Sequence, residues 1–289
     1  MDISLILKIG IIIGIILVFI FIFSLLQFLI SIHPPKFYDY KTPKDFNIEY
    51  EDISFITSDN VKIKGWLIKS DKADGTVIIG HGYPFDKGNI LPVAKFLYPD
   101  YNLLFYDHRY FGESEGRITT VGLKEVEDVK SAIKFVKEKF GKDEPIALYG
   151  FSLSASAMLM TNQKVNAIIA DSAYSNLEDM VEQIYSIFGP FKFPFVKITE
   201  MLSKIFFGKY LYEVSPESVI RNSTIPILVI HGEKDSQISV ENAYALKKSN
   251  PNIELWIVKG ADHGYSYAIN PNEYKNRIKL FLKNHMRSQ

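Results

Sequence analysis

An uninterrupted apolar stretch near the N-terminus constrains this chain more than any other feature. From Ile9 to Phe23 the side chains are only those of Ile, Leu, Val, Phe and two Gly. The apolar character continues to Ile32, with three polar interruptions: Ser24, Gln27 and Ser31. A helix rises about 1.5 Å per residue, so this stretch can cross the roughly 30 Å hydrocarbon layer of a bilayer. We therefore predict a single-pass transmembrane anchor over residues 1–33 that contacts the lipid bilayer through residues 9–32.

Two other interpretations of the stretch are a cleaved signal peptide and a buried core helix. A signal peptide has a shorter apolar region and small residues at its cleavage site, whereas this stretch ends in Leu29-Ile30-Ser31-Ile32-His33-Pro34. A core helix is rarely apolar on every face. Lysine is also more frequent just after the stretch than before it: Lys36, Lys41 and Lys44 against Lys8. The lack of a cleavage site predicts that the anchor is not cleaved. The positive-inside rule predicts that the rest of the chain lies in the cytoplasm.

Composition excludes several classes of protein. The chain has 289 residues, with 33 basic and 33 acidic side chains, and this balance argues against a nucleic-acid partner. It contains no cysteine, which excludes a disulfide framework, a thiol nucleophile and a thiolate metal site. The length suits one large α/β domain or two small ones.

The remainder of the chain alternates short apolar runs with helical patterns. Strands are predicted at 48–57, 61–69, 76–80, 101–106, 145–150, 165–171, 225–230 and 253–258, and helices at 120–141 and 154–161. The first two strands are separated by Ser58-Asp59-Asn60, which is typical of a hairpin. Short buried strands that alternate with helices predict an α/β fold, in which a mostly parallel central sheet carries helices on both faces.

The domain organisation follows from these patterns. Residues 34–47 are predicted to be a tether that begins at a pair of prolines, and residues 48–289 form the α/β domain. Within it, residues 176–215 break the alternation, because they are long, rich in Phe and Tyr, and interrupted by Gly189-Pro190 and Pro194. We expect a helical cap insertion over one end of the sheet.

Candidate catalytic residues follow three predicted strands, at the sheet edge where such folds bind ligands. Ser152 stands in Gly150-Phe151-Ser152-Leu153-Ser154, at a strand-to-helix turn that projects its hydroxyl clear of the sheet. Ser154 and Ser156 compete as nucleophiles, but neither lies at the turn itself. His263 is the candidate base and Asp235 the candidate acid that orients it, with Asp171 as the other candidate for the acid.

An acyl-transfer reaction also needs donors for the oxyanion. One is expected to be the backbone amide of Leu153, which follows the candidate nucleophile. The other is expected in the loop after the strand at 76–80, where Gly82 allows a sharp turn and Pro84 has no amide. We assign that second donor to the amide of Tyr83.

These segments together resemble the α/β-hydrolase superfamily, and more narrowly its membrane-anchored BEM46-like group. The resemblance covers about residues 48–285. It rests on Gly150–Ser154, His81-Gly82, Asp107-His108-Arg109 with Phe111-Gly112-Glu113-Ser114, His231-Gly232 with Asp235, and Asp262-His263-Gly264. It implies the α/β-hydrolase fold and a serine-hydrolase mechanism with Ser152, Asp235 and His263 as the triad. Ser154 departs from the pattern, which has glycine at that position.

The reaction expected from this resemblance is cleavage of carboxylic esters, including acyl, lipid or thioesters, with no cofactor. A peptidase or amidase with the same triad and a non-catalytic membrane-bound binding protein are the alternatives. No metal is expected at His81, His108 and His231, because no cluster at ligand spacing accompanies them. The aromatic cap is expected to line an acyl-chain pocket, to pack on the sheet, or to dip into the bilayer surface.

Overall fold

Short runs of β-branched and aromatic residues form one eight-stranded sheet. The computed structural model describes residues 3–286, so residues 1–2 of the predicted anchor and 287–289 of the predicted α/β domain lie outside the described residues. The strands are β1 (Glu51–Ile56), β2 (Lys62–Ile68), β3 (Thr76–Gly80), β4 (Asn102–Tyr106), β5 (Ile146–Phe151), β6 (Ala167–Asp171), β7 (Ile227–Gly232) and β8 (Glu254–Val258). Their order across the sheet is β1-β2-β4-β3-β5-β6-β7-β8.

The sheet is mostly parallel, as predicted. Strands β1 and β2 form an antiparallel hairpin, and β2 also pairs antiparallel with β4. From β4 to β8 every neighbouring pair is parallel. The residues of β3, β4, β6 and β7 are all buried, which explains their continuous apolar runs. The carboxyl ends of these strands therefore meet at one edge.

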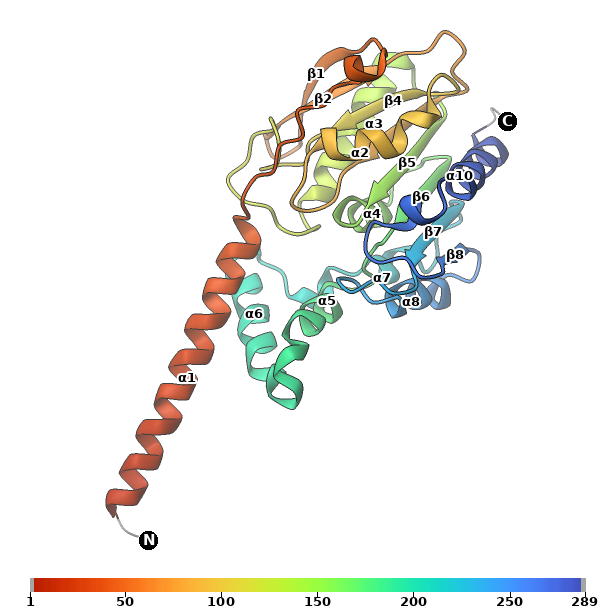
Figure 1. Cartoon of the computed structure of the whole chain (residues 1–289). Coiled ribbons are helices and arrows are strands. Elements are labelled where there is room, and N and C mark those ends of the chain that lie inside the picture. The colour runs from red at the N-terminus through yellow and green to blue at the C-terminus, as the bar shows by residue number, and fades with distance from the viewer. Residues whose placement is uncertain (1–2, 287–289) are drawn as a thin grey trace.

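Helices cover both faces of the sheet (Figure 1). One face packs against α3 (Glu125–Phe140), α4 (Leu153–Leu159), α7 (Pro216–Ile220) and α8 (Glu241–Ser249). The other face packs against α2 (Lys87–Ala94), η2 (Lys95–Leu97) and α10 (Pro271–His285), and the short helices η1 (Pro43–Phe46) and α9 (Ser266–Ile269) complete this part of the chain. This arrangement confirms the predicted fold class.

Two details differ from the predictions. Helix α2 was not predicted, because Gly88 and Pro92 are poor helix formers. It forms because the Asp86 carboxylate caps its first turn and because its apolar side chains are buried. Helix α3 begins at Glu125, five residues later than the predicted start at 120, since Glu125 uses its carboxylate to bind Thr119 and Thr120 ahead of the helix.

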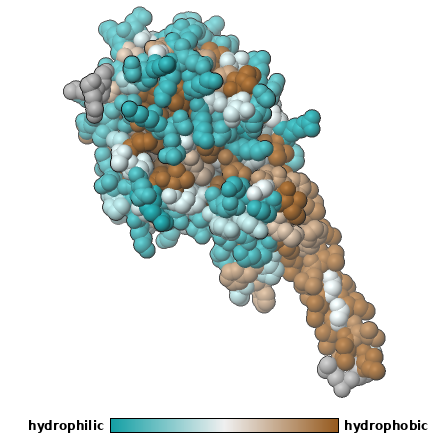
Figure 2. All heavy atoms as spheres, turned by 180° about the vertical axis from the view of Figure 1, so that it is seen from behind, coloured by the Kyte–Doolittle hydropathy of each residue, from teal (hydrophilic) through white to brown (hydrophobic). Residues whose placement is uncertain are grey.

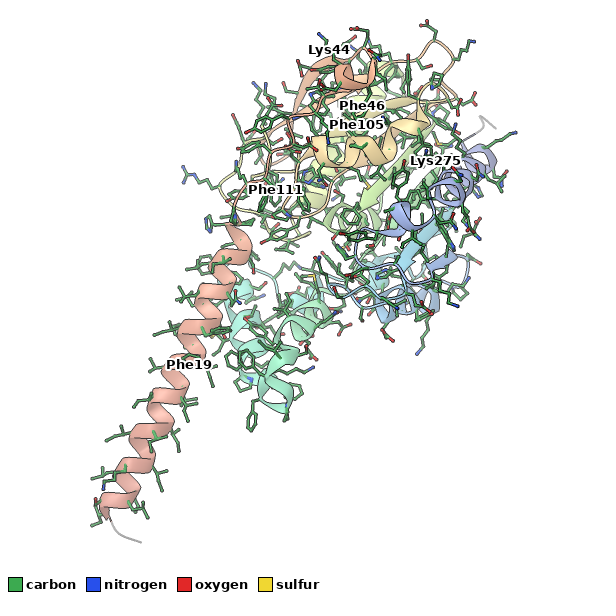
Figure 3. The ribbon with its side chains drawn as sticks, viewed as in Figure 1. Phe19, Lys44, Phe46, Phe105, Phe111 and Lys275 are labelled. Atoms are coloured by element: carbon green, nitrogen blue, oxygen red, sulfur yellow. The ribbon has the colours of Figure 1, made fainter. Side chains whose placement is uncertain are left out.

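The insertion between β6 and β7 forms a helical cap beside the N-terminal helix. The cap consists of α5 (Leu177–Ile184), η3 (Tyr185–Phe191), α6 (Lys192–Phe207) and η4 (Leu211–Glu213). Helix α1 (Ile3–Ile32) extends away from the sheet, and α6 lies along its C-terminal part (Figure 1). Figure 3 shows Phe19 on the projecting part of α1 and Phe105 inside the domain.

Helix α1 is the one helix of residues 3–286 that is long and apolar enough to cross a membrane. An N-terminal signal sequence meets the same criterion. Most of its side chains are exposed, and its apolar surface projects from the more polar body of the molecule (Figure 2).

Candidate active site

Ser152 stands at a sharp turn between β5 and α4. Its backbone has φ 52° and ψ −109°, a left-handed conformation that residues other than glycine rarely adopt. Its N–H donates to the carbonyl of Asp171 at 2.8 Å. A Cβ at Gly150 would come within 2.5 Å of the backbone nitrogen of Ala155, so the close crossing of strand and helix requires glycine there.

The side chain of His263 lies between Ser152 and Asp235. Its Nε2 is 3.1 Å from Oγ of Ser152, and its Nδ1 is 2.8 Å from Oδ2 of Asp235. The other carboxylate oxygen of Asp235 accepts the backbone N–H groups of Gln237 and Ile238 at 3.0 and 2.7 Å. Because the carboxylate can only accept, Nδ1 carries the proton and Nε2 is left to accept the serine proton.

The other nearby carboxylates have different partners. Asp171 accepts a hydrogen bond from the Tyr274 hydroxyl at 2.6 Å, and burial raises the pKa of its carboxyl group above the usual range. Asp262 accepts the backbone N–H of His263 at 2.7 Å. The fold thus brings Asp235 to the imidazole of His263, and Asp171, the other sequence candidate, hydrogen-bonds elsewhere.

The two amides expected to bind an oxyanion belong to residues that border the same space. Tyr83 and Leu153 line the pocket that contains Ser152. In the part of the chain that the structure describes, neither backbone N–H donates to another residue. Glycine at position 82 lets the loop approach closely, because a Cβ there would come within 2.6 Å of the Phe151 ring. Burial raises the pKa of the Tyr83 phenol to about 12, so this side chain stays neutral.

A pocket of about 560 Å³ lies beside Ser152 and His263. The cap supplies much of its wall, and helix α1 supplies a part that the sequence reasoning missed. The residues from α1 are Gln27, Phe28, Ser31 and Ile32. One feature of the sequence could have indicated this contribution of α1. The three polar residues of the apolar stretch, Ser24, Gln27 and Ser31, are three and four residues apart, which puts them on one helix face.

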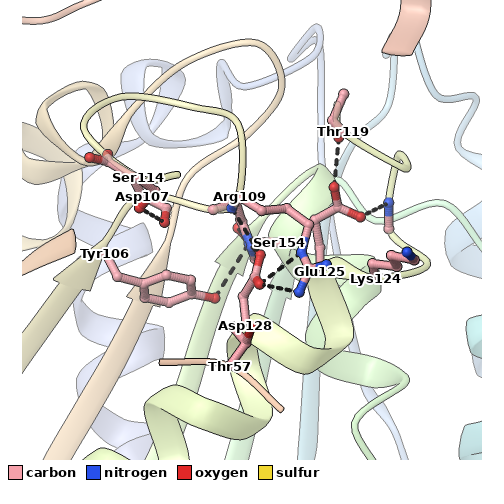
Figure 4. A network of polar contacts seen from close by, with 12 residues as sticks. Thr57, Tyr106, Asp107, Arg109, Ser114, Thr119, Lys124, Glu125, Asp128 and Ser154 are labelled. Carbon is pink, nitrogen blue, oxygen red and sulfur yellow. Dashed lines mark hydrogen bonds and ion pairs between the residues drawn. The ribbon is translucent and has the colours of Figure 1, made fainter. Parts of the chain in front are cut away.

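A second serine–histidine–aspartate group lies buried behind the turn. Oγ of Ser154 is 2.7 Å from Nε2 of His108, whose Nδ1 is 3.2 Å from Oδ2 of Asp128. The Arg109 guanidinium binds the other oxygen of Asp128 at 2.9 and 2.8 Å (Figure 4). The Ser154 hydroxyl also donates to the carbonyl of His81. This group therefore joins the loops after β3 and β4 to helices α3 and α4.

A buried ion pair supports the loop that carries Tyr83, and sequence reasoning missed it. Nζ of Lys87 lies 2.7 Å from Oδ2 of Asp107, whose carboxylate also accepts the N–H groups of Lys87 and Glu113. Burial alone would lower the pKa of Lys87, but Asp107 raises it above the usual range. The pair fixes the start of α2, directly after the loop.

The three histidines considered as metal ligands have other partners. Nε2 of His81 accepts the N–H of His108 at 3.0 Å, and burial lowers the pKa of His81 to about 4. Nε2 of His231 donates to the carbonyl of Ile238 at 2.8 Å. Among the described residues, no three His, Asp or Glu side chains cluster in a way that could hold a metal ion.

Comparison with known proteins identifies the family. The BD-FAE family model matches residues 84–249, more than half of the chain. The uncharacterized protein YqkD of Bacillus subtilis is 29% identical over 233 residues, which cover 77% of this chain and 75% of that protein. Protein bem46 of Schizosaccharomyces pombe is 28% identical over 204 residues, which cover 67% of this chain and 63% of that protein.

A solved structure agrees with these matches. The esterase Pf2001 of Pyrococcus furiosus superposes with a TM-score of 0.72 at 30% identity, over 89% of this chain and 98% of that chain. The esterase name of this neighbour and the family match support a hydrolase. The chain belongs to the BD-FAE family and is an α/β-hydrolase that resembles the BEM46 group.

Proposed function

We propose that this protein is a membrane-anchored serine hydrolase that cleaves carboxylic esters. The observation that carries the proposal is the unbroken line of hydrogen-bonding groups from Asp235 through His263 to Ser152, at the wall of a pocket. The strained backbone of Ser152 supports the proposal, because it suits a nucleophile at a sharp turn. The two nearby amides, which donate to no other described residue, support it because they can bind an oxyanion.

In the first half of the reaction, Oγ of Ser152 attacks the acyl carbon of the ester while Nε2 of His263 takes its proton. The carbonyl oxygen becomes an oxyanion, which the amides of Tyr83 and Leu153 bind. Asp235 holds the imidazole in the required tautomer and stabilises its charged form. When the ester C–O bond breaks, His263 gives the proton to the leaving alcohol, and the acyl group remains on Ser152.

In the second half, His263 takes a proton from a water molecule, and the hydroxide equivalent attacks the acyl-enzyme. When the bond between Oγ and the acyl carbon breaks, His263 returns this proton to Oγ, so the products are a carboxylic acid and the regenerated Ser152 hydroxyl. The cycle needs no cofactor, because every proton transfer uses the same imidazole.

We also propose that α1 is an uncleaved anchor, with the hydrolase domain on the cytoplasmic side. Its length and apolar composition support a membrane span. The three lysines that follow the span support the orientation.

The proposal is tested on the full chain by covalent labelling with a fluorophosphonate and by hydrolysis of nitrophenyl esters, with Ser152→Ala as the comparison. We expect the wild type to be labelled and to turn over esters, and Ser152→Ala to do neither. Equal labelling of both proteins would show that a residue other than Ser152 is the nucleophile. Preferential cleavage of a matched amide substrate would instead indicate a peptidase or amidase.

A further inference from the structure

The pocket beside Ser152 is built partly from the helix that we propose as the membrane anchor. Four residues of α1 line it: Gln27, Phe28, Ser31 and Ile32. A helix that serves only as a tether needs no contact with the site. Because α1 forms a wall of the pocket, the position of the substrate is tied to the position of the bilayer.

Helix α1 is fixed against the cap by aromatic packing. The ring of Phe23 meets those of Phe188 and Phe195 edge-on, both at centroid distances of 5.6 Å. At the end of the helix, the carbonyl of Ile32 accepts the N–H of Thr119 at 3.0 Å. The aromatic contacts hold α1 to the cap, and the hydrogen bond joins α1 to the segment before α3, so the depth of α1 in the bilayer also sets the depth of the cap.

Counted from Lys8, the one charged residue of α1, the part of the helix before its first buried residue is too short to cross the hydrocarbon layer. Fifteen residues separate Lys8 from Ser24, the first α1 residue that is completely buried, and they span about 22 Å as a helix. The layer is about 30 Å thick, so it extends roughly five residues further, to about Phe28. The cap packs against this segment and therefore lies within or against the acyl layer.

The outer face of the cap has the surface expected in that environment. Phe191 is 76% exposed, and Ile187, at the rim of the pocket, is 81% exposed. Further exposed apolar side chains of the cap are Ile184, Phe193, Ile205 and Phe206. Figure 2 shows apolar surface along the free part of α1 and at the tip of the cap beside it. In water this surface would be costly to expose, whereas in contact with lipid it is favourable.

The polar residues in the C-terminal half of α1 face the pocket and the cap. Gln27 and Ser31 are four residues apart and both line the pocket, and Ser24 lies on the same face. The neighbouring positions Leu26 and Ile30 are apolar and more than half exposed. The helix thus presents hydrocarbon outward and hydrogen-bonding groups inward, as expected where an ester group passes between lipid and enzyme.

We propose that the substrate is a long-chain acyl ester of a lipid in the bilayer that holds α1, and that its acyl chain reaches Ser152 laterally, through the pocket that α1 and the cap enclose. This inference rests on the proposed ester hydrolase. The acyl group transfers from the lipid oxygen to Oγ of Ser152, and His263 delivers the proton to the lipid alcohol, which stays in the membrane. Water then releases the acyl group as a carboxylic acid.

The test uses the full chain in phosphatidylcholine vesicles. Hydrolysis of methylumbelliferyl palmitate in the vesicles is compared with that of methylumbelliferyl acetate in the surrounding water. Ser31→Trp places a large side chain in the pocket. Ile30→Trp places the same side chain on the outer face of α1, one residue earlier in the chain. We expect the palmitate-to-acetate ratio to fall roughly tenfold or more in Ser31→Trp and to be unchanged in Ile30→Trp.

A second matched pair guards against misfolding. If Ser31→Trp fails to react with a fluorophosphonate, Gln27→Trp is compared with Leu26→Trp in the same way. A ratio that is equal in the pocket-facing and outward-facing variants overturns the lateral-entry proposal and leaves the ester hydrolase intact. A wild type that is inert toward both esters overturns the ester hydrolase, and this inference with it.

The depth of the cap can be measured directly, because the chain contains no cysteine. Ile187→Cys on the cap and Lys134→Cys on α3 each give a single site for an environment-sensitive fluorophore. We expect a quencher attached to the lipid acyl chains to quench the label at position 187 and to spare the one at position 134. Equal quenching at the two positions would show that the cap does not enter the acyl layer.

Discussion

Two serine–histidine–aspartate groups lie within a few residues of each other in this molecule, and they differ in surroundings rather than in composition. In the pocket, His263 bridges Ser152 and Asp235. Behind the same turn, His108 lies between Ser154 and Asp128 at distances of 2.7 and 3.2 Å. Both imidazoles face a carboxylate with Nδ1 and a serine with Nε2.

The difference lies in access and in the destination of the serine proton. Ser152 lines the pocket, where a substrate carbonyl can reach it. Ser154 is completely buried, and its hydroxyl donates to the carbonyl of His81. Its proton therefore points at a backbone carbonyl and not at His108, so the imidazole does not activate this serine. Residue types alone do not make a catalytic group, because the serine proton must be free and the oxygen accessible.

The largest expected effect separates the two serines. Ser152→Ala removes the proposed nucleophile, and ester turnover should fall on the order of 10⁶-fold. Ser154→Ala should keep turnover within about tenfold, because its hydroxyl does not reach the pocket, but should lower the free energy of unfolding by about 1–3 kcal/mol through the unpaired groups left behind. Steady-state kinetics and thermal unfolding of the full chain in detergent measure both effects.

A loss of turnover in Ser154→Ala as large as that in Ser152→Ala would contradict this assignment. It would show that the buried group takes part in the chemistry or that it controls the geometry of the turn. Fluorophosphonate labelling of Ser154→Ala separates these two cases from a simple failure to fold.

Substitution of the two aspartates, Asp235 and Asp128, should separate activity from stability as the two serines do, with smaller effects on turnover. Asp235→Asn loses the group that sets the tautomer of His263, and kcat should fall on the order of 10⁴-fold with little change in stability. Asp128→Asn leaves the buried Arg109 with Asp59 as its remaining carboxylate partner, which should cost up to about 3 kcal/mol of stability, with activity per folded molecule largely retained. The reverse pattern would exchange the roles of the two groups.

Much of the fold follows from local patterns in the sequence. The strand Thr76–Gly80 is predicted at both ends, because a fully buried parallel strand is a continuous apolar run and a glycine closes it. The end of α3 is marked by Gly141. Helix α2 is not predictable in this way, since its stability comes from burial and from the Asp86 cap rather than from its own propensity.

In the candidate site, too, local patterns predict some residues, whereas others depend on long-range packing. Ser152, Asp235 and His263 can be selected because each follows a recognisable strand. The contribution of α1 to the pocket depends on packing between two apolar surfaces, such as Phe23 on Phe195, and apolar patterns do not specify their partners. The buried partners of Ser154 are equally long-range, and only the three-dimensional fold brings them together.

His81 connects the two groups and gives the smallest of the predicted effects. Its carbonyl accepts from Ser154, and the chain continues directly to Tyr83, the proposed oxyanion donor. Burial, helped by the nearby charges of His108 and Lys87, lowers the pKa of His81 from 6.5 to about 4. Between these two pH values the unfolded chain binds a proton that the folded one does not, so stability should fall as the pH decreases from about 6.5 to 4, by up to about 3 kcal/mol from this residue.

The measurement is the titration of the histidine rings in the full chain by nuclear magnetic resonance. The imidazole of His81 should remain neutral down to about pH 4, because protonation would convert Nε2 from an acceptor of the His108 N–H into a second donor facing it. A His81 ring that titrates near 6.5 in the folded protein would show that this region opens to water. The buried group would then lack the exclusion from solvent by which we distinguish it from the group in the pocket.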